Sequence, residues 1–445
     1  MIDNNTVMQR DLEVIWHPCT QMKDHETLPL IPIRSGEGVY LFDFEDNSYI
    51  DAVSSWWVNL FGHANPYINA RIKAQLDTLE HVLLAGFTHE PAVELAHALV
   101  NITPETLKKV FYVDNGSSAV EAALKMSYHY HRNRGKKKSL FLSLTNSYHG
   151  ETIGALSVGD VALYKETYQP LLIANKQVPV PVGQSKEAAH EALEVLESVL
   201  ASHAEEIAAF ILEPLIQGAG GMHMYHPKYL EGARKLTRQY DVHLIADEIM
   251  TGFGRTGKMF ACEHAGISPD FMTLSKGLTG GYLPLSVVMT TDDIYSAFYC
   301  DYNEHKAFLH SHSYTGNPLA CTAALATLEI FEQERVLESN LEKSLYMAQK
   351  LQRFEVLKNV KEVRQQGMVA AVELSGYEAQ ERIGIQIYRY GLANGVLLRP
   401  LGNVIYFMPP YVITYEQIDT MMNVAYEGIA RLTEKEKQYE YRTTF

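Results

Sequence analysis

Two residues, Asp247 and Lys276, each follow a short apolar run and could act together at one site. The runs cover residues 242–246 and 271–274, and the lysine follows the aspartate by 29 residues. Such runs with polar residues at their ends are typical of buried strands. In an open α/β sheet ligands bind beyond the carboxyl ends of the strands, so both side chains should lie at one edge. An acid and an amine so placed suit pyridoxal phosphate, although a buried ion pair or a lysine on a solvated loop would give the same spacing.

The segment between these two residues contains a glycine pattern that is typical of dinucleotide-binding proteins. Residues 252–257 (GFGRTG) fit G-x-G-x-x-G. A dinucleotide site also requires a tight strand-to-helix turn and an acidic residue about 20 positions further on. Here Asp247 and Glu248 precede the glycines, and no sizeable helix is evident after them. We therefore reject a dehydrogenase and predict a flexible loop at the edge of the site.

A third predicted strand, residues 109–113, leads directly into the polar loop 114–118 (DNGSS). Ser118 and Glu121 form the pattern of a capping box, which predicts that a helix covers residues 119–133. Glycine, hydroxyl groups and free amides at a helix start can bind an anion, so this loop is a candidate phosphate site. An ordinary strand–loop–helix connection would have the same composition.

Aromatic residues stand at two further positions that could contact a cofactor or a substrate. Tyr148 and His149 follow the predicted strand 139–144 and could stack on a planar ring, although packing at a turn would also explain them. The chain has three tryptophans, all within its first 57 residues: Trp16, Trp56 and Trp57. Their clustering in a loop-rich stretch suggests an aromatic wall, against the alternative of simple packing.

Composition and charge exclude several classes of function. The chain has 38 basic and 53 acidic residues, a net charge of −15, which argues against a nucleic-acid or anionic-membrane partner. No apolar run approaches the length of a membrane span, and the first residues do not resemble a signal peptide. We therefore expect a cytoplasmic protein.

The cysteines and histidines do not suggest a disulfide framework or a metal site. Four cysteines in 445 residues suit a reducing compartment. The pairs Cys262 with His264 and His310 with His312 lack partners at recognised ligand spacing, so no metal is expected.

The order of predicted elements indicates more than one domain, because 445 residues are too many for one core. Residues 1–35 look irregular, and residues 38–53 alternate around a turn like a β-hairpin. Alternating strands and helices in the middle predict an α/β fold with a mostly parallel, doubly wound sheet. From about residue 332 the pattern becomes α+β. With the family resemblance described next, we expect an N-terminal segment 1–59 that joins a small domain, a large domain 60–330 and a C-terminal small domain 331–445.

Five motifs occur in the order and spacing found in one enzyme class. They are FYVDNGSSAVEAALKM from 111, NSYHGETIGALSVGD from 146, ADEIMTGFGRTGKMFACEH from 246, LSKGLTGGYLPLS from 274 and HSYTGNPLAC from 312. Together they resemble the class III (ω-) aminotransferases over nearly the whole chain. The resemblance implies fold type I, with pyridoxal 5′-phosphate as cofactor.

The resemblance also implies roles for individual residues at the cofactor. Lys276 matches the Schiff-base lysine, and Asp247 matches the partner of the pyridine nitrogen. Tyr148 matches the aromatic residue stacked on the ring, and Gly116 with Ser117 matches the phosphate loop. In this class, the freed lysine carries a proton as general acid–base in a ping-pong reaction between an amino donor and a keto acid.

Three further motifs resemble one branch of the class, which converts 8-amino-7-oxononanoate to 7,8-diaminononanoate in biotin biosynthesis. They are IWHPCTQM from 15, SSWW from 54 and LLRPLGNVIYFMPPY from 397. By this resemblance Arg399 holds the substrate carboxylate, and Trp56, Tyr406 and Gly281 lie around the substrate. Ser313 falls where the class places a threonine that reaches the phosphate of the other subunit, which implies a homodimer with shared sites.

One departure bears on the amino donor. The commonest form of the branch motif has a tyrosine after His-Pro, where this chain has Cys19. Trp56-Trp57 and residues 408–411 resemble enzymes that use S-adenosylmethionine, whereas residues 62–63 and 21–23 resemble enzymes that use lysine. We expect S-adenosylmethionine, with lysine as the alternative. The rival functions are another ω-amino acid or diamine aminotransferase, a mutase of the glutamate-semialdehyde type, and a cofactor-binding scaffold without turnover.

Overall fold

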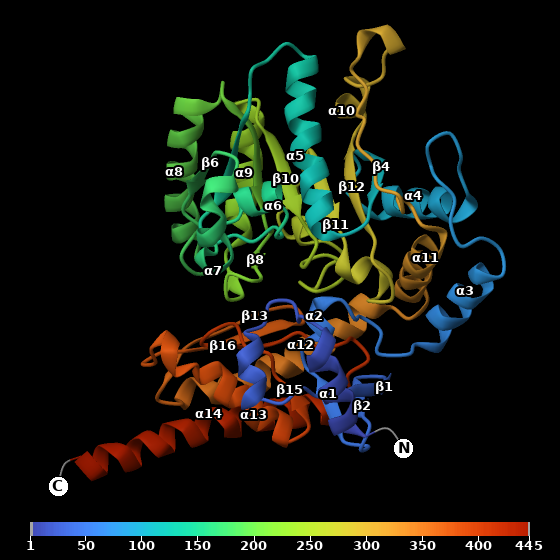
Figure 1. Cartoon of the computed structure of the whole chain (residues 1–445). Helices are drawn as coiled ribbons and strands as arrows, with labels where there is room; N and C mark the ends of the chain where they lie inside the picture. The colour runs from blue at the N-terminus through green and yellow to red at the C-terminus, as the bar shows by residue number, and fades with distance from the viewer. Residues whose placement is uncertain (1–2, 444–445) are drawn as a thin grey trace. The chain divides into compact units, whose positions relative to one another are not determined.

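The computed structural model describes residues 3–443, which fall into two compact units (Figure 1). Unit 1 combines the N-terminal residues up to Pro66 with Lys343–Arg364 and the residues from Ala370 onward. Unit 2 consists of Tyr67–Glu342 together with Gln365–Val369. Each unit therefore has its own framework, and the two are described separately.

Unit 2 is built on a seven-stranded sheet in the order β4-β12-β11-β10-β7-β5-β6. Strand β12 runs antiparallel to β4 and β11, and the remaining neighbours are parallel. The prediction of an α/β fold with a mostly parallel sheet is confirmed. The strands are β4 (Leu107–Val113), β5 (Leu140–Leu144), β6 (Asn175–Val178), β7 (Ile207–Leu212), β10 (His243–Asp247), β11 (Phe271–Leu274) and β12 (Ser286–Thr291), with a separate hairpin of β8 (Ile216–Gln217) and β9 (His223–Met224).

The central strands are short apolar runs because helices cover the sheet and remove both faces from water. Every residue of β7 and β11 is buried. Helix α5 packs across β12, β11, β10 and β7, and its alanines form the core with those strands. The helices of unit 2 are α3 (Pro66–Leu76), α4 (Glu90–Ile102), α5 (Gly116–Asn133), α6 (Ile153–Val158), α7 (Ala162–Lys165), α8 (Lys186–His203), α9 (Pro227–Gln239), α10 (Asp292–Ser296) and α11 (Pro318–Gln333).

Unit 1 contains two small sheets, in the orders β1-β2-β3-β15 and β13-β14-β16. The hairpin predicted within residues 38–53 is present, with β2 paired antiparallel to β3. The strands are β1 (Ile33–Glu37), β2 (Tyr40–Asp43), β3 (Ser48–Asp51), β13 (Val360–Gln366), β14 (Val369–Leu374), β15 (Val396–Leu397) and β16 (Val404–Phe407). The helices are α1 (Asn4–Val14), α2 (Ser54–Trp57), α13 (Ile383–Ala393), α14 (Tyr415–Thr443) and the part of α12 (Val336–Leu351) from Lys343 onward.

Two sequence predictions about helices were wrong. Residues 1–35 were expected to be irregular, but they contain helix α1. Asp3 caps this helix by accepting a hydrogen bond from the Thr6 amide at 2.8 Å. No residue of α1 is buried, so its apolar side chains form no core-facing stripe. Helix α5 starts at Gly116 with Asn115 as its cap, and the expected capping box is absent. Glu121 instead accepts from the amides of Gly154 and Ala155 at the start of α6.

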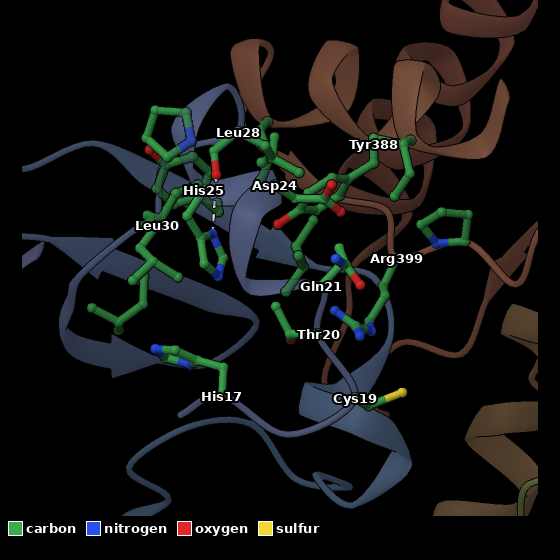
Figure 2. A pocket seen from close by; sticks show the side chains of 18 of the residues that line it. His17, Cys19, Thr20, Gln21, Asp24, His25, Leu28, Leu30, Tyr388 and Arg399 are labelled. Atoms are coloured by element: carbon green, nitrogen blue, oxygen red, sulfur yellow. Dashed lines mark hydrogen bonds between the residues drawn. The ribbon is translucent and has the colours of Figure 1, made fainter. Parts of the chain in front are cut away.

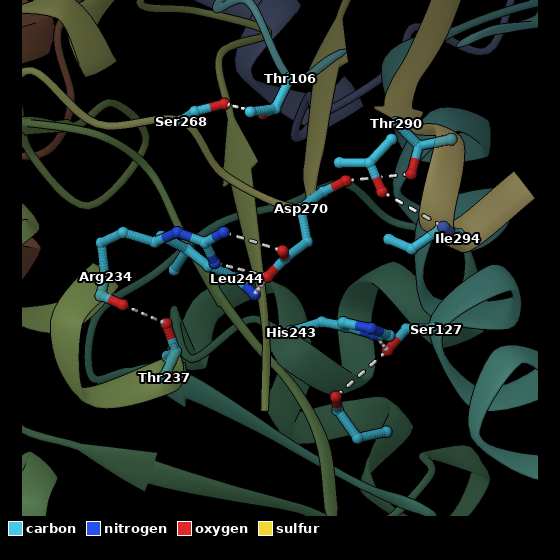
Figure 3. Close-up of polar contacts among 12 residues, drawn as sticks. Thr106, Ser127, Arg234, Thr237, His243, Leu244, Ser268, Asp270, Thr290 and Ile294 are labelled. Atoms are coloured by element: carbon cyan, nitrogen blue, oxygen red, sulfur yellow. Dashed lines mark hydrogen bonds and ion pairs between the residues drawn. The ribbon is translucent and has the colours of Figure 1, made fainter. Parts of the chain in front are cut away.

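A partly buried polar cluster lies at the amino-terminal end of β10 (Figure 3). Asp270 accepts two hydrogen bonds from Arg234, at 2.6 and 2.9 Å, and one from the Leu244 amide at 2.7 Å. On the other side His243 contacts the Ser127 hydroxyl at 2.8 Å, and its ring stacks on His131 at 4.5 Å. Burial lowers the pKa of His131 to about 3 and the pKa of His243 to about 4.

This histidine pair should make the fold sensitive to mild acid. Both rings stay neutral in the folded chain, whereas an unfolded histidine binds a proton below about pH 6.5. The free energy of unfolding is therefore unaffected by these two histidines above pH 6.5. It falls as the pH drops from there toward 4, by on the order of 1.4 kcal/mol per pH unit for each histidine. In His131→Gln, the decrease of the thermal midpoint between pH 7 and pH 5 should become smaller. The exposed His190→Gln variant is the control, and an unchanged decrease in His131→Gln would contradict the prediction.

Candidate active site

The carboxylate of Asp247 lies at the carboxyl end of β10, buried and surrounded by donors. His149 donates from Nδ1 to Oδ2 over 2.7 Å. The Thr273 hydroxyl and the Ile249 amide both donate to Oδ1 at 3.2 Å. Together these three donors fix the orientation of the Asp247 carboxylate at the edge of the sheet.

Lys276 lies just beyond the end of β11, the strand that pairs with β10. In this pair Asp247 is in register with Thr273. Because β10 and β11 are parallel, the acid and the amine are at the same edge, as the sequence predicts. The lysine has a left-handed backbone, with φ +45°. Burial lowers the pKa of Lys276 to about 8, and the charges of Asp247 and Glu213 oppose part of that shift. At pH 7 about a tenth of this amine is therefore neutral and able to act as nucleophile or base, far more than for an ordinary lysine.

Glu213 is a third titratable group at this edge, and sequence reasoning did not single it out. Its carboxylate accepts from the amide of Tyr148 at 2.9 Å and from the amide of Gly218 at 2.8 Å. Burial raises the pKa of Glu213 to about 7, with His149 and the two amides lowering it and Asp247 raising it. A signal was present, because Glu213 follows a buried strand just as Asp247 does.

Tyr148 and His149 come from the loop after β5. The Glu213 carboxylate fixes the Tyr148 backbone, while the Tyr148 hydroxyl donates to Glu151 at 3.1 Å. His149 is buried and contacts Asp247, so the two aromatic residues have different surroundings. The structure thus brings the loop after β5 to the same sheet edge as Asp247.

The start of α5 forms the remaining part of the site in unit 2. Gly116 and Ser117 are the first two residues of this 18-residue helix, where amides lack partners within the helix. The Ser117 hydroxyl is 2.9 Å from that of Thr152. A side chain at Gly150 (φ +120°) would overlap Ser117, so glycine permits the loop after β5 to approach the helix. Amides, a hydroxyl and the helix dipole make this an anion-binding position.

Trp56 and Arg399 contact each other in unit 1. The Arg399 guanidinium carbon lies 4.8 Å from the centre of the Trp56 ring, in cation–π geometry. Arg399 also lines a pocket of about 410 Å³, where it lies among Cys19, Thr20 and Gln21 (Figure 2). Much of the remaining lining is aliphatic: Leu28, Leu30, Ile33, Leu41, Ile385 and Leu392.

The pocket contains one acid, Asp24, which is already paired with a different arginine. Arg382 donates two hydrogen bonds to Asp24, at 2.9 and 2.6 Å. Within the part of the chain whose side chains are described, no ion pair involves Arg399. Its guanidinium therefore provides a positive charge beside an aliphatic surface.

Tyr406 is buried and accepts from the Trp57 indole nitrogen at 2.9 Å. The structure thus places Tyr406 beside Trp57, whereas Trp56 contacts Arg399. Gly281 in unit 2 is exposed with φ +89°. Ser313 is also exposed, and its carbonyl accepts from His81 at 2.8 Å.

The G-x-G-x-x-G segment is a loop and not a strand-to-helix turn. It is packed and not a loose edge, since Phe253 and Arg255 are buried. Among the described residues, no cluster of histidine, cysteine or acidic side chains could hold a metal ion. Within the same residues, no helix combines the length and apolar character needed to cross a membrane.

Comparison with known proteins identifies the family. The sequence model of the family "Aminotransferase class-III" matches residues 21–427 of this chain. The chain is a class-III aminotransferase. It is 54% identical to the adenosylmethionine-8-amino-7-oxononanoate aminotransferase of Helicobacter pylori, over 92% of this chain and 94% of the relative.

Solved structures agree with this assignment. The crystal structure of adenosylmethionine-8-amino-7-oxononanoate aminotransferase from Methanocaldococcus jannaschii has a TM-score of 0.93 and 42% identity, covering 96% of this chain and 99% of the other. An ω-transaminase from Pseudomonas jessenii in complex with PMP has a TM-score of 0.91 and 30% identity, covering 96% and 98%. Both the fold class and the enzyme class predicted from the sequence are confirmed.

The residues of unit 2 fit pyridoxal phosphate, the cofactor of this aminotransferase class. The α5 amides and Ser117 suit its phosphate, and the buried carboxylate of Asp247 suits a protonated ring nitrogen. Lys276 offers an amine of lowered pKa to the aldehyde. The donor set therefore matches the three chemically distinct parts of the cofactor.

Proposed function

We propose that this aminotransferase converts 8-amino-7-oxononanoate to 7,8-diaminononanoate in biotin biosynthesis. The observation that carries the proposal is the Arg399–Trp56 pair beside the aliphatic pocket in unit 1. A guanidinium on an aromatic ring next to aliphatic side chains suits a carboxylate with a hydrocarbon chain. The names of the Helicobacter and Methanocaldococcus relatives specify the same substrate.

In this proposal each residue has a separate chemical task. Arg399 binds the substrate carboxylate through two parallel hydrogen bonds. Lys276 holds the cofactor and, once released from it, moves a proton on and off its Nζ atom, which a pKa of about 8 permits near neutral pH. Asp247 pairs with the ring nitrogen, oriented by His149.

When bound, the cofactor supplies the electron sink that makes removal of the proton from the substrate carbon feasible. Tyr148 covers the ring, Gly116 and Ser117 hold the phosphate, and Tyr406 and Gly281 border the substrate.

The amino donor is proposed to be S-adenosylmethionine, with lysine as the alternative. The test is a donor screen with purified holoenzyme and 8-amino-7-oxononanoate, in which mass spectrometry detects 7,8-diaminononanoate. Product with S-adenosylmethionine, and not with lysine, supports the proposal in full. Product with lysine alone corrects only the donor. An enzyme that aminates simple ketones or aldehydes but not this keto acid would instead belong with the ω-transaminases, to which it is 30% identical in the Pseudomonas example.

We also propose that the enzyme is a homodimer in which Ser313 contacts the phosphate bound to the other subunit. The segments 81–87 and 309–316 lie side by side, joined by the hydrogen bond from His81 to Ser313. They expose large apolar side chains, an arrangement that a second copy could cover. These side chains are Leu83, Phe87, Leu309 and Tyr314.

Mixing two inactive variants tests the shared site. Ser313→Glu places a negative charge against the phosphate, and Lys276→Ala removes the reactive amine. If sites are shared, a heterodimer of the two variants has one site with both lesions and one intact site. Half of the dimers are heterodimers after random exchange of an equal mixture, so activity should rise toward about a quarter of that of the wild-type dimer. Exchange verified by mass, with activity no higher than that of Ser313→Glu alone, would contradict the shared site. Ser311→Glu, in the same exposed turn, should remain active.

A further inference from the structure

We infer that Asp51 and His63 are positioning residues for the substrate carboxylate, because they hold the turn that sets Trp56 against Arg399. The inference rests on the proposed function, in which Arg399 binds that carboxylate. Neither residue lines the pocket around Arg399. Both would act through the backbone of residues 54–57, which we call the tryptophan turn.

The tryptophan turn has an unusual backbone that needs support from its surroundings. Its four residues, Ser54 to Trp57, have φ values of 51°, 46°, 74° and 75°. Non-glycine residues rarely adopt this left-handed region, and a run of four is much rarer than a single case. Such conformations persist only where neighbouring groups determine them.

Asp51 supplies most of the support at the start of the turn. Its side chain is completely buried. The carboxylate accepts from the Ser55 amide at 2.9 Å, from the Ser55 hydroxyl at 2.7 Å and from the Val53 amide at 3.4 Å. It therefore fixes Ser55, the residue immediately before Trp56.

His63 completes the set of donors to Asp51. Its Nε2 donates to the second carboxylate oxygen over 3.0 Å, and its Nδ1 accepts from Asn59 at 3.2 Å. The histidine backbone exchanges two hydrogen bonds with Gly38, at 3.2 and 2.7 Å. A side chain at Gly36 would overlap His63, so this glycine permits the close packing. The β1–β2 turn thus anchors the ring, and the ring in turn anchors Asp51.

The other hydrogen bonds of the tryptophan turn hold its first and last residues, Ser54 and Trp57. Ser54 donates to the Met408 carbonyl at 2.7 Å, and Trp57 donates to Tyr406. Trp56 is 42% exposed and makes the cation–π contact with Arg399. Because its own side chain is so exposed, the Trp56 ring depends on the Ser55 backbone for its orientation. Weakening Asp51 or His63 should therefore loosen Arg399 and reduce its affinity for carboxylates.

The test measures binding of heptanoate, a carboxylate with a simple chain, with heptanamide as the neutral control. Quenching of tryptophan fluorescence in the holoenzyme gives both dissociation constants, and steady-state kinetics give KM and kcat for the keto acid. His63→Leu removes the donor to Asp51 and keeps bulk, whereas His63→Gln can keep a donor near Nε2. Asn47→Ala is the matched control, because it breaks a hydrogen bond to Asp43 in the same unit, away from the tryptophan turn.

We expect His63→Leu to weaken heptanoate binding and raise KM roughly tenfold, with heptanamide binding and kcat changed less than about threefold. His63→Gln should recover most of the loss. Ser55→Ala, a milder change that removes one hydrogen bond to Asp51, should shift heptanoate in the same direction by less. Together these results would separate positioning from general stability.

Two kinds of outcome would overturn the inference. One is wild-type heptanoate affinity in both His63→Leu and Ser55→Ala while Arg399→Ala loses it. The other is an Asn47→Ala variant that loses as much affinity as His63→Leu. A wild-type enzyme that binds heptanoate no better than heptanamide, with Arg399→Ala unchanged, would overturn the carboxylate site itself and the inference with it.

Discussion

Replacement of Lys276 by alanine should abolish turnover while leaving the protein folded. The variant loses both the amine that holds the cofactor and the group that moves the proton. General acid–base catalysis alone contributes roughly 10²–10⁴-fold, so kcat should fall by at least that factor. The Lys276 amine lies in surroundings that lower its pKa to about 8, a burial cost that alanine does not incur. The thermal midpoint should therefore stay close to that of the wild-type enzyme without cofactor.

A covalent label distinguishes this role from indirect damage. Borohydride reduction of the holoenzyme and peptide mapping should place the pyridoxyl group on Lys276. Lys258 is the matched control, because it lies in the same segment and its Nζ donates to the Glu263 carbonyl at 3.0 Å. Lys258→Ala should keep both turnover and label. A label recovered on Lys258 would remove Lys276 from the proposed role.

The framework of unit 2 was predictable because its strands are short apolar runs that end in polar residues. Buried parallel strands leave few other patterns, so the positions of Asp247 and Lys276 at one sheet edge followed from the sequence. Glu213 obeys the same rule, since β7 pairs with β10 and Leu212 is in register with Ala246. The sequence does not show that β7 lies beside β10, so it does not place Glu213 next to Asp247.

Other features had no signal in local periodicity. Helix α1 buries none of its residues, so its apolar side chains do not mark it. The left-handed backbone of Ser54 to Trp57 depends on Asp51, His63 and Met408, which the sequence does not bring together. Propensity describes a residue and its near neighbours, whereas these conformations are set by contacts across the fold.

Replacement of Arg399 by alanine should raise KM for the keto acid far more than it lowers kcat. Loss of a charge-assisted contact costs about 1.5–3 kcal/mol, or roughly ten- to a hundredfold in affinity. The contact is remote from the reacting carbon, so it should contribute to binding of the substrate and the transition state alike. The half-reaction with the amino donor, followed by cofactor absorbance, should change less unless Arg399 also binds the donor's carboxylate.

Two further variants show whether the geometry of the guanidinium matters. Arg399→Lys keeps the charge but cannot form two parallel hydrogen bonds, so it should recover only part of the loss. Arg382→Lys is the matched control, because Arg382 lines the same pocket but pairs with Asp24. Its KM for the keto acid should stay within about threefold of wild type, since an exposed ion pair contributes little. An Arg399→Ala enzyme with unchanged KM would remove this arginine from the substrate site and leave the preference for a long-chain carboxylate without a structural basis in unit 1.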